Sequence, residues 1–215
     1  MNQNALCSWS GGKDSCFALM QAVDQGYFPK VLLNVLNEEG KISRSHGIPY
    51  HILQEQANAA EVFLHCISSS WQEYESRFTS ALMDLKTGFN VDIAIFGDID
   101  LQEHRDWEEK VCNNAGLTAV LPLWKEDRKQ LAMRMLESGM EAMIVSCNEV
   151  LGEDFIGKIL TPSLISELES MGIDPCGENG EYHTLVLDCP LFSYPVKASV
   201  ARSARHDNYW FSELA

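Results

Sequence analysis

The chain has 215 residues, of which 46% are hydrophobic, and its formal net charge is −15 from 31 acidic and 16 basic residues. This composition excludes a disordered chain, and no apolar run is long enough to span a bilayer, so we expect a soluble, cytoplasmic protein. So negative a chain repels polyanions, which argues against a nucleic-acid partner. The seven cysteines form no C-x-x-C pair, which favours free, buried thiols.

Short apolar segments alternate with amphipathic segments through the first 150 residues. The predicted strands are 5–9, 31–36, 62–67, 92–97, 119–121 and 141–146, and the predicted helices are 15–25, 71–86, 103–114 and 128–138. Apolar strands that are separated by helices indicate a parallel sheet covered on both faces. We therefore predict an α/β fold with a doubly wound parallel sheet for residues 1–150.

The pattern changes after Val150. A glycine-rich stretch leads to a predicted helix at 162–171, with Thr161 as its N-cap and Pro162 at its first position. A polar, glycine-rich segment follows, and then an apolar run and a final alternating segment. We predict that residues 151–215 form a small C-terminal lobe that binds substrate.

Between the first predicted strand and the first predicted helix lies a glycine-rich turn, Ser10-Gly11-Gly12-Lys13-Asp14-Ser15. Glycines let backbone N–H groups approach a phosphate closely, and a helix N-terminus favours its negative charge. Lys13 and the two serine hydroxyls add side-chain donors, and we expect Lys13 to face solvent with little core packing. The spacing differs from the GxxxxGK[ST] loop of P-loop NTPases.

This turn resembles the SGGxDS signature of the PP-loop ATP pyrophosphatases. The resemblance implies that the turn holds the β,γ-pyrophosphate of ATP and leaves the α-phosphorus open to attack. Lys13 and Asp14 are therefore candidate catalytic residues, and Asp14 is a candidate Mg²⁺ ligand.

One segment of the C-terminal lobe combines two carboxylates, an imidazole and an amide: Gly177-Glu178-Asn179-Gly180-Glu181-Tyr182-His183-Thr184. A structural turn does not need so many ionisable groups, so we expect this loop to bind substrate. Its carboxylates could hold a cation, and an imidazole moves protons near neutral pH. We expect Glu178, Glu181 and His183 to point into a cleft beside the α-phosphate of ATP and to act in catalysis.

Further candidates follow the predicted strand at 92–97. Gly97 and Asp98 are expected to contact the nucleotide, and Asp98 could instead bind Mg²⁺, orient substrate or cap a helix. His104 and Arg105 either contact substrate or begin a solvated helix.

Together these motifs resemble the diphthine-ammonia ligases and their ATP-binding relatives. The resemblance covers nearly the whole chain and includes 10–15, 97–99 with Arg105, Glu109 and Cys112, then 122–124, 151–152, and 177–184 with 190–192. It implies a HUP-type fold, ATP and Mg²⁺, and a reaction in which a carboxylate, ammonia and ATP give an amide, AMP and pyrophosphate through an acyl-adenylate. In that family the carboxylate belongs to diphthine, a modified histidine on a translation elongation factor.

Two segments depart from the family pattern. Residues 103–107 stand where the ligases show a Tyr-Gln-Arg-like segment, and residues 43–47 stand where they show Tyr-Met-x-x-His. Both follow predicted strands, where open α/β sheets bind ligands, so another acceptor carboxylate stays open. We expect free ammonium or a small amine as the nitrogen donor, because the chain has no room for a glutaminase domain.

Two other functions stay open. One is a PP-loop enzyme that adenylates a base of tRNA, which the negative charge and the lack of a C-x-x-C pair disfavour. The other is a sensor that binds adenine nucleotides without turnover. A homo-oligomer is also open.

Overall fold

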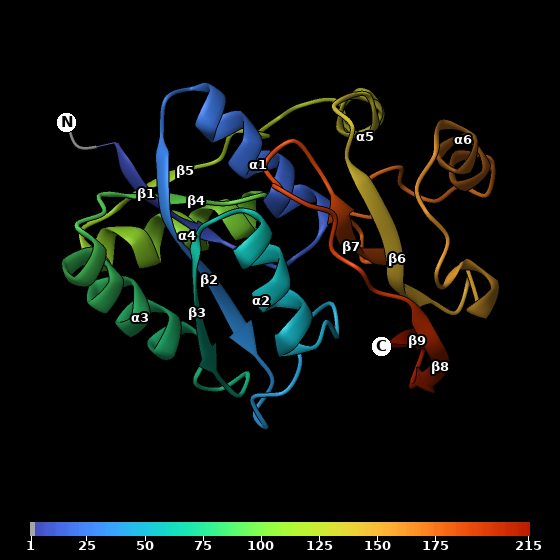
Figure 1. Cartoon of the computed structure of the whole chain (residues 1–215), viewed down its shortest axis with the longest axis horizontal. Helices are drawn as coiled ribbons and strands as arrows, with labels where there is room; N and C mark the ends of the chain where they lie inside the picture. The colour runs from blue at the N-terminus through green and yellow to red at the C-terminus, as the bar shows by residue number, and fades with distance from the viewer. Residues whose placement is uncertain (1–2) are drawn as a thin grey trace.

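The structure, a computed structural model, describes residues 3–215, and these form two sheets. The first sheet has the order β3-β2-β1-β4-β5, and its strands are β1 (Asn4–Ser8), β2 (Phe28–Leu36), β3 (Phe63–Ser68), β4 (Ile93–Ile95) and β5 (Thr118–Val120). The second has the order β7-β6-β9-β8, and its strands are β6 (Glu141–Asn148), β7 (Tyr182–Asp188), β8 (Val200–His206) and β9 (Tyr209–Leu214). Figure 1 shows the two sheets side by side.

The first sheet is parallel throughout, and its strand order reverses between β1 and β4. The helices of the chain are α1 (Lys13–Asp24), α2 (Tyr50–Ala59), α3 (Tyr74–Phe89), α4 (Gln102–Ala115), α5 (Arg128–Glu137), the 3-10 helix η1 (Glu153–Phe155) and α6 (Pro162–Ser170). The predicted doubly wound α/β fold is confirmed. Within residues 3–215, no helix has the length and apolar character needed to cross a membrane.

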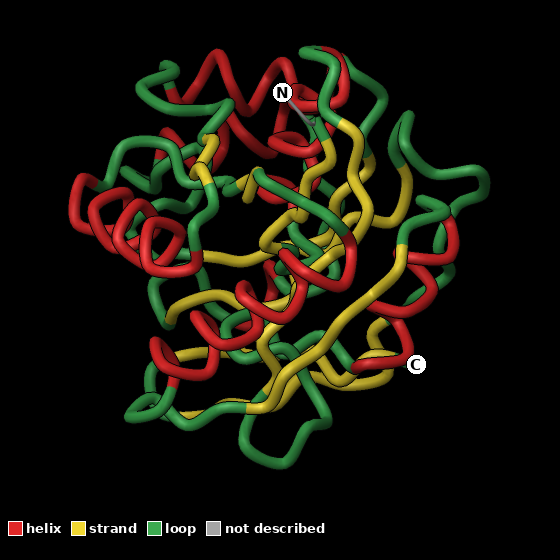
Figure 2. Tube along the Cα trace, turned by 90° about the vertical axis from the view of Figure 1, so that its left-hand side faces the viewer, coloured by secondary structure: helices red, strands yellow, loops and turns green. Residues whose placement is uncertain are grey.

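Helices cover both faces of the parallel sheet (Figures 1 and 2). On one face, Leu6 and Leu33 pack in a cluster with Phe78 of α3 and Val111 of α4. On the other face, Leu32 belongs to a larger cluster that includes α1, α2 and the second sheet. Because neighbouring residues of a strand point to opposite faces, β2 contributes to both clusters. The second sheet therefore shares its core with the α1 and α2 side of the first.

The predicted strand at 141–146 does not continue the parallel sheet. It forms β6, so the strand itself is confirmed, but β6 pairs antiparallel with β7 and β9, so its predicted place in the parallel sheet is wrong. A short apolar run indicates a strand but carries no information on its partners. The second sheet begins before residue 150, and the division of the chain into two domains at that residue stays a prediction.

Helix α2 has no counterpart among the predicted elements. Its buried stripe includes Ile52, Leu53 and Ala57, and it is interrupted by the fully buried Gln56. A polar residue in the middle of the stripe hides the helical period in the sequence.

Gln56 connects α2 to the glycine-rich turn and to the second sheet. Its Nε2 donates to the carbonyls of Gly11 at 2.9 Å and Val186 at 2.8 Å. Its Oε1 accepts from Trp9 Nε1 at 3.0 Å. A buried amide is stable only with such partners, so Gln56 fixes how these three segments meet.

Gln56→Met should destabilise the fold, because an apolar side chain of similar length leaves the Trp9 donor and the Val186 acceptor without this partner. We expect the free energy of unfolding in urea to fall by about 2–4 kcal/mol, since each buried group left unpaired costs about 1–3 kcal/mol. Gln54→Met on the same helix is the control, because Gln54 is only half-buried and bonds exposed neighbours. Equal losses in the two variants would show that Gln56 has no special connecting role.

Candidate functional site

The residues after β1 form a tight turn that leads into α1. Gly11 has a φ of +85°, in the left-handed region that glycine adopts without strain. The hydroxyl of Ser15 accepts from the N–H of Ser10 at 3.3 Å, and the two serine Oγ atoms lie 3.0 Å apart. The N–H of Gly12 donates to the Ser10 hydroxyl at 3.2 Å. The turn thus holds both hydroxyls at the N-terminus of α1.

Strand β4 ends beside this turn. A Cβ atom on Gly97 would lie 2.7 Å from the carbonyl carbon of Asp14 and 2.7 Å from the N of Ser15, so only glycine permits the approach. Asp98 follows and shares a cavity with Asp14 and Ser15. This is the carboxyl edge of the sheet at the reversal of strand order, where open α/β sheets bind ligands.

Strand β7 closes the other side of the turn. The N–H of Val186 donates to the carbonyl of Gly11 at 3.0 Å. The N–H of Lys13 donates to Oγ1 of Thr184 at 3.0 Å, across 171 positions of sequence. The structure therefore brings together the two motifs that the sequence analysis singled out.

A cavity of about 580 Å³ lies between these segments and the ends of β1, β2 and β4. Its wall contains these candidate residues: Ser10, Asp14, Ser15, Gly97, Asp98, His104, Gly177, Glu178, Gly180, Tyr182 and His183. The other candidates lie outside the wall: Gly11, Gly12, Lys13, Arg105, Asn179, Glu181 and Thr184.

Lys13 is buried, with 2% of its surface exposed, so the prediction of a solvent-facing side chain is wrong. Its Nζ lies 2.8 Å from Oδ2 of Asp14, donates to the carbonyl of Cys176, and lies 5.2 Å from the ring centroid of Tyr182. Burial lowers the pKa of Lys13, but the neighbouring negative groups, Asp14 first, raise it above its usual value. The C-terminal lobe covers a charged lysine here, which no local sequence pattern reveals.

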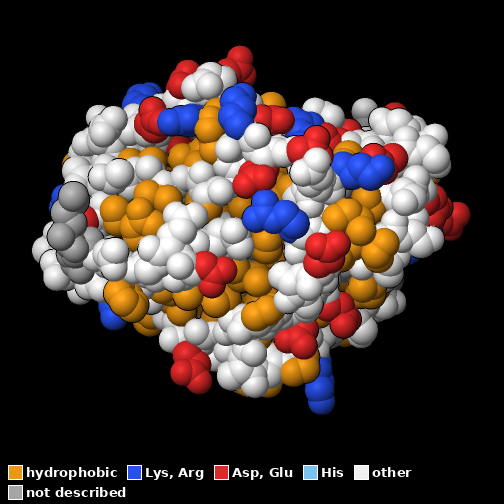
Figure 3. All heavy atoms as spheres, turned by 90° about the horizontal axis from the view of Figure 1, so that it is seen from above, with side chains coloured by type: hydrophobic (Ala, Val, Ile, Leu, Met, Phe, Trp, Pro, Cys, Tyr) orange, Lys and Arg blue, Asp and Glu red, His pale blue; other side chains and the backbone are white. Residues whose placement is uncertain are grey.

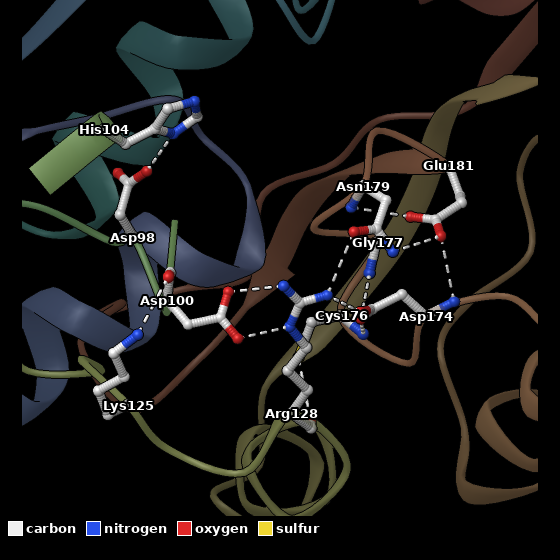
Figure 4. A network of polar contacts seen from close by, with 10 residues as sticks. All are labelled: Asp98, Asp100, His104, Lys125, Arg128, Asp174, Cys176, Gly177, Asn179 and Glu181. Atoms are coloured by element: carbon white, nitrogen blue, oxygen red, sulfur yellow. Dashed lines mark hydrogen bonds and ion pairs between the residues drawn. The ribbon is translucent and has the colours of Figure 1, made fainter. Parts of the chain in front are cut away.

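Glu181 does not face the cavity, so the prediction that it points into the cleft is wrong. Its oxygens accept from the N–H of Asn179 at 3.0 Å, from Nδ2 of Asn179 at 3.1 Å and from the N–H of Asp174 at 3.3 Å (Figure 4). A carboxylate that accepts several N–H groups of its own loop stabilises that loop. Glu181 therefore stabilises the loop at 177–184 from the side away from the cavity.

Glu178 does line the cavity. Burial, and then the charge of Asp14, raise its pKa to about 8, although Lys13 acts in the opposite direction. The side chain can thus gain or lose a proton close to neutral pH.

Asp98 is linked to two residues of α4. Nδ1 of His104 lies 2.6 Å from Oδ1 of Asp98, and Glu108 is hydrogen-bonded to the same carboxylate. Burial raises the pKa of Asp98, but these hydrogen bonds bring it below its usual value. Burial raises the pKa of Glu108 to about 11, so its carboxyl group is protonated and can donate to Asp98. Glu108 was not a candidate, although its position four residues after His104 places both on one helix face.

Two histidines face the glycine-rich turn. The ring centroids of His46 and His183 lie 4.5 Å apart, and a Cβ atom on Gly12 would lie 2.7 Å from Nε2 of His46. Burial, then His183 and Lys13, lower the pKa of His46 well below its usual value. Burial, and then Lys13, lower the pKa of His183 to about 4. Both imidazoles are therefore neutral at pH 7. In the sequence, His46 stands out only as part of the 43–47 segment.

A charged network joins the C-terminal loop to the rest of the molecule (Figure 4). Arg128, the first residue of α5, contacts Asp100 through Nε at 2.9 Å and Nη2 at 2.6 Å, and it contacts Asp174 through Nη1. Asp174 also accepts from the N–H groups of Cys176 at 2.6 Å and Gly177 at 3.1 Å. Arg128 thus positions the loop that forms one wall of the cavity.

The charges around the cavity are mostly acidic. Its wall contains Asp14, Asp98, Glu103 and Glu178, together with the protonated Glu108, and among the described lining residues Arg44 is the only Arg or Lys. On the outer face in Figure 3, Lys and Arg side chains lie among Asp and Glu side chains. Binding of a nucleic-acid backbone needs a cluster of basic groups. Neither the described cavity wall nor the face in Figure 3 has such a cluster.

The fold and the turn after β1 define the class, a PP-loop type of nucleotide-binding α/β protein. The family models agree with it: the N-terminal domain of diphthamide synthase matches residues 2–119, and the C-terminal domain of diphthamide synthase matches residues 127–214. The chain belongs to the diphthamide synthase family, and the resemblance in its motifs is confirmed.

Several curated relatives have the name diphthine-ammonia ligase. The protein of Mus musculus is 26% identical over an alignment of 232 positions, which covers 96% of this chain and 86% of the relative, and that of Homo sapiens is 27% identical with the same coverage. The protein of Schizosaccharomyces pombe is 29% identical over 85% of this chain, which is 34% of that longer protein. A solved structure, the predicted subunit of a tRNA methyltransferase from Methanocaldococcus jannaschii, is 15% identical and has a TM-score of 0.47. The match covers 87% of this chain and 98% of the chain in that structure.

Arg128→Met should loosen the C-terminal loop, because it leaves the buried Asp174 and the half-buried Asp100 without their cation. Solvent screens part of this network, so we expect the free energy of unfolding to fall by about 1–3 kcal/mol. Amide hydrogen exchange over 174–181 should become faster. Lys129→Met is the matched control, because Lys129 is exposed and pairs with Glu169 at the surface. If loop exchange is the same in both variants, Arg128 does not position the loop.

Proposed function

We propose that the protein is an ATP-dependent amide ligase that joins ammonia to a carboxylate and releases AMP and pyrophosphate. The observation that carries this proposal is that the turn at 10–15 and the loop at 177–184 form two walls of one cavity. These are the two most specific motifs of the chain. The names of the relatives, which align over most of the chain, support the same reaction.

The cavity suits ATP in size and polarity. About 580 Å³ is within the range of ligand sites, about 300–1,000 Å³. Leu33, Val35 and Phe96 offer an apolar surface for the adenine ring, whereas the hydroxyls of Ser10 and Ser15 lie at the phosphate end. The N-terminus of α1 favours negative charge at that end.

Asp14 is the residue that would hold Mg²⁺. Its Oδ1 is buried and has no hydrogen-bond partner in the part of the chain that the structure describes, which suits an oxygen that binds a cation. Residues 3–215 contain no group of three or more His, Cys, Asp or Glu side chains able to hold a metal. Mg²⁺ commonly binds one or two carboxylates together with substrate phosphates, so this arrangement fits it. The ion would stabilise negative charge on the phosphates.

In the proposed reaction the acceptor carboxylate attacks the α-phosphorus, and the bond to the β-phosphate breaks. Pyrophosphate leaves and an acyl-adenylate forms. Ammonia then attacks the acyl carbon, AMP leaves, and the amine loses a proton. Glu178 is our candidate for the group that accepts this proton, because its pKa of about 8 suits a base near neutral pH. Lys13 supports Asp14 and the loop at Cys176, and the lobe above it excludes water.

For the acceptor, diphthine, which the names of the relatives contain, is the first candidate to test. His104 lies in the cavity wall and is proposed to contact the acceptor. Arg105 instead pairs with Glu109 at 2.7 Å and lies 4.9 Å from the ring centroid of Trp124, so we propose a structural role for it.

Product analysis by phosphorus NMR tests the proposed function. The protein is incubated with ATP, Mg²⁺, ammonium and a panel of carboxylates that includes an elongation factor carrying diphthine. We expect AMP and pyrophosphate together with the amide. ADP and orthophosphate as the main products would contradict the proposal, and ATP binding without any cleavage would favour the sensor.

Glu178→Gln should reduce kcat by about 10²–10⁴-fold, the usual contribution of a general base. In the wild type, kcat at a fixed concentration of free ammonia should rise as the pH passes about 8, because Glu178 acts only after it loses its proton. The variant should lack this rise. Glu109→Gln, a change outside the cavity wall, serves as the control. A Glu178→Gln enzyme with an unchanged pH profile would remove Glu178 from this role.

A further inference from the structure

We propose that His46 and His183 together bind the pyrophosphate group of the nucleotide against the glycine-rich turn. This inference rests on the proposed function, because it concerns the leaving group of that reaction. In this proposal His46 binds the β- and γ-phosphates of ATP, or free pyrophosphate.

The two imidazoles lie beside the glycine-rich turn at the edge of the cavity. His46 comes from the segment after β2 and His183 from β7, and both line the cavity together with Ser10 and Ser15. Nε2 of His46 is so close to Gly12 that even a methyl group there would meet it at 2.7 Å. Gly12 thus lets an imidazole N–H reach the phosphate side of the turn.

The other cations near the turn are at least partly engaged. Nζ of Lys13 contacts Asp14 and the carbonyl of Cys176, and Lys13 does not line the cavity. The guanidinium of Arg44 donates to the carbonyl of Ser69 and lies 4.3 Å from the ring centroid of Trp71, although its buried Nε has no hydrogen-bond partner among the described residues. The two imidazoles add side-chain N–H donors that a pyrophosphate at the turn could use.

The charges that face the pair explain how it would respond to the ligand. Burial and then the charge of Lys13 keep both rings neutral when no anion is present, and His183 also lowers the pKa of His46. Asp14 and Glu178 are acidic groups that line the same cavity. A pyrophosphate adds several negative charges, which favour the imidazolium form. Each ring that takes a proton from solvent gains a second N–H group, which can donate to phosphate oxygens. The ring releases this proton when pyrophosphate leaves.

Isothermal titration calorimetry tests this site without any acceptor. Inorganic pyrophosphate, ATP and AMP are titrated at pH 7 in two buffers that differ in ionisation enthalpy. For the wild type we expect proton uptake with pyrophosphate and ATP but not with AMP. Absence of proton uptake, or no binding of pyrophosphate, would overturn the proposal.

His46→Gln keeps a neutral N–H donor but cannot titrate. We expect its affinity for pyrophosphate and ATP to fall about 10-fold, as a lost charge-assisted hydrogen bond predicts, while its affinity for AMP stays unchanged and reports that the variant is folded. His51→Gln, on the exposed side of α2, should behave as the wild type. An equal loss for AMP and ATP, or no loss for pyrophosphate, would contradict the assignment.

The result separates the two proposals. If AMP and pyrophosphate are formed in turnover but His46→Gln binds pyrophosphate like the wild type, the inference fails and the ligase proposal stands. If the wild type binds pyrophosphate with proton uptake but forms ADP and orthophosphate, the ligase proposal fails and the site stands.

Discussion

The contact between β7 and the glycine-rich turn is the constraint on which the site depends. Two hydrogen bonds of 3.0 Å, Val186 to Gly11 and Lys13 to Thr184, hold the strand against the turn, and Gln56 contacts both from the side. The buried backbone of the turn needs such partners. The second sheet is therefore part of the phosphate site and not an addition to it.

Burial by this contact also sets the chemistry of the cavity. Charges interact more strongly away from water, which is why Lys13 stays charged beside Asp14. Loss of hydration on burial, and then the charge of Asp14, raise the pKa of Glu178 to about 8. The same burial keeps His183 neutral, and it gives Glu108 a proton to donate to Asp98. A strongly charged ligand can therefore change the protonation of the residues in the cavity wall.

Features that depend on neighbouring residues could be predicted from the sequence. The apolar strands, the turn at 10–15 and the dense polar loop at 177–184 depend on neighbouring residues, and the motifs identify the family. The partners of β6, the burial of Lys13 and the direction of Glu181 depend on contacts between distant segments, so they were missed or predicted wrongly. Gln56 gave no signal for the same reason, and His46 stood out only as part of the 43–47 segment, because each acts through a residue far away in the chain.

Both parts of the chain are proposed to build one nucleotide site, and amide hydrogen exchange with and without ATP tests this most directly. We predict that ATP slows exchange at residues 10–16 and also at residues 176–184. Protection confined to 10–16, with exchange at 176–184 unchanged by ATP, would contradict the claim that the C-terminal loop belongs to the site.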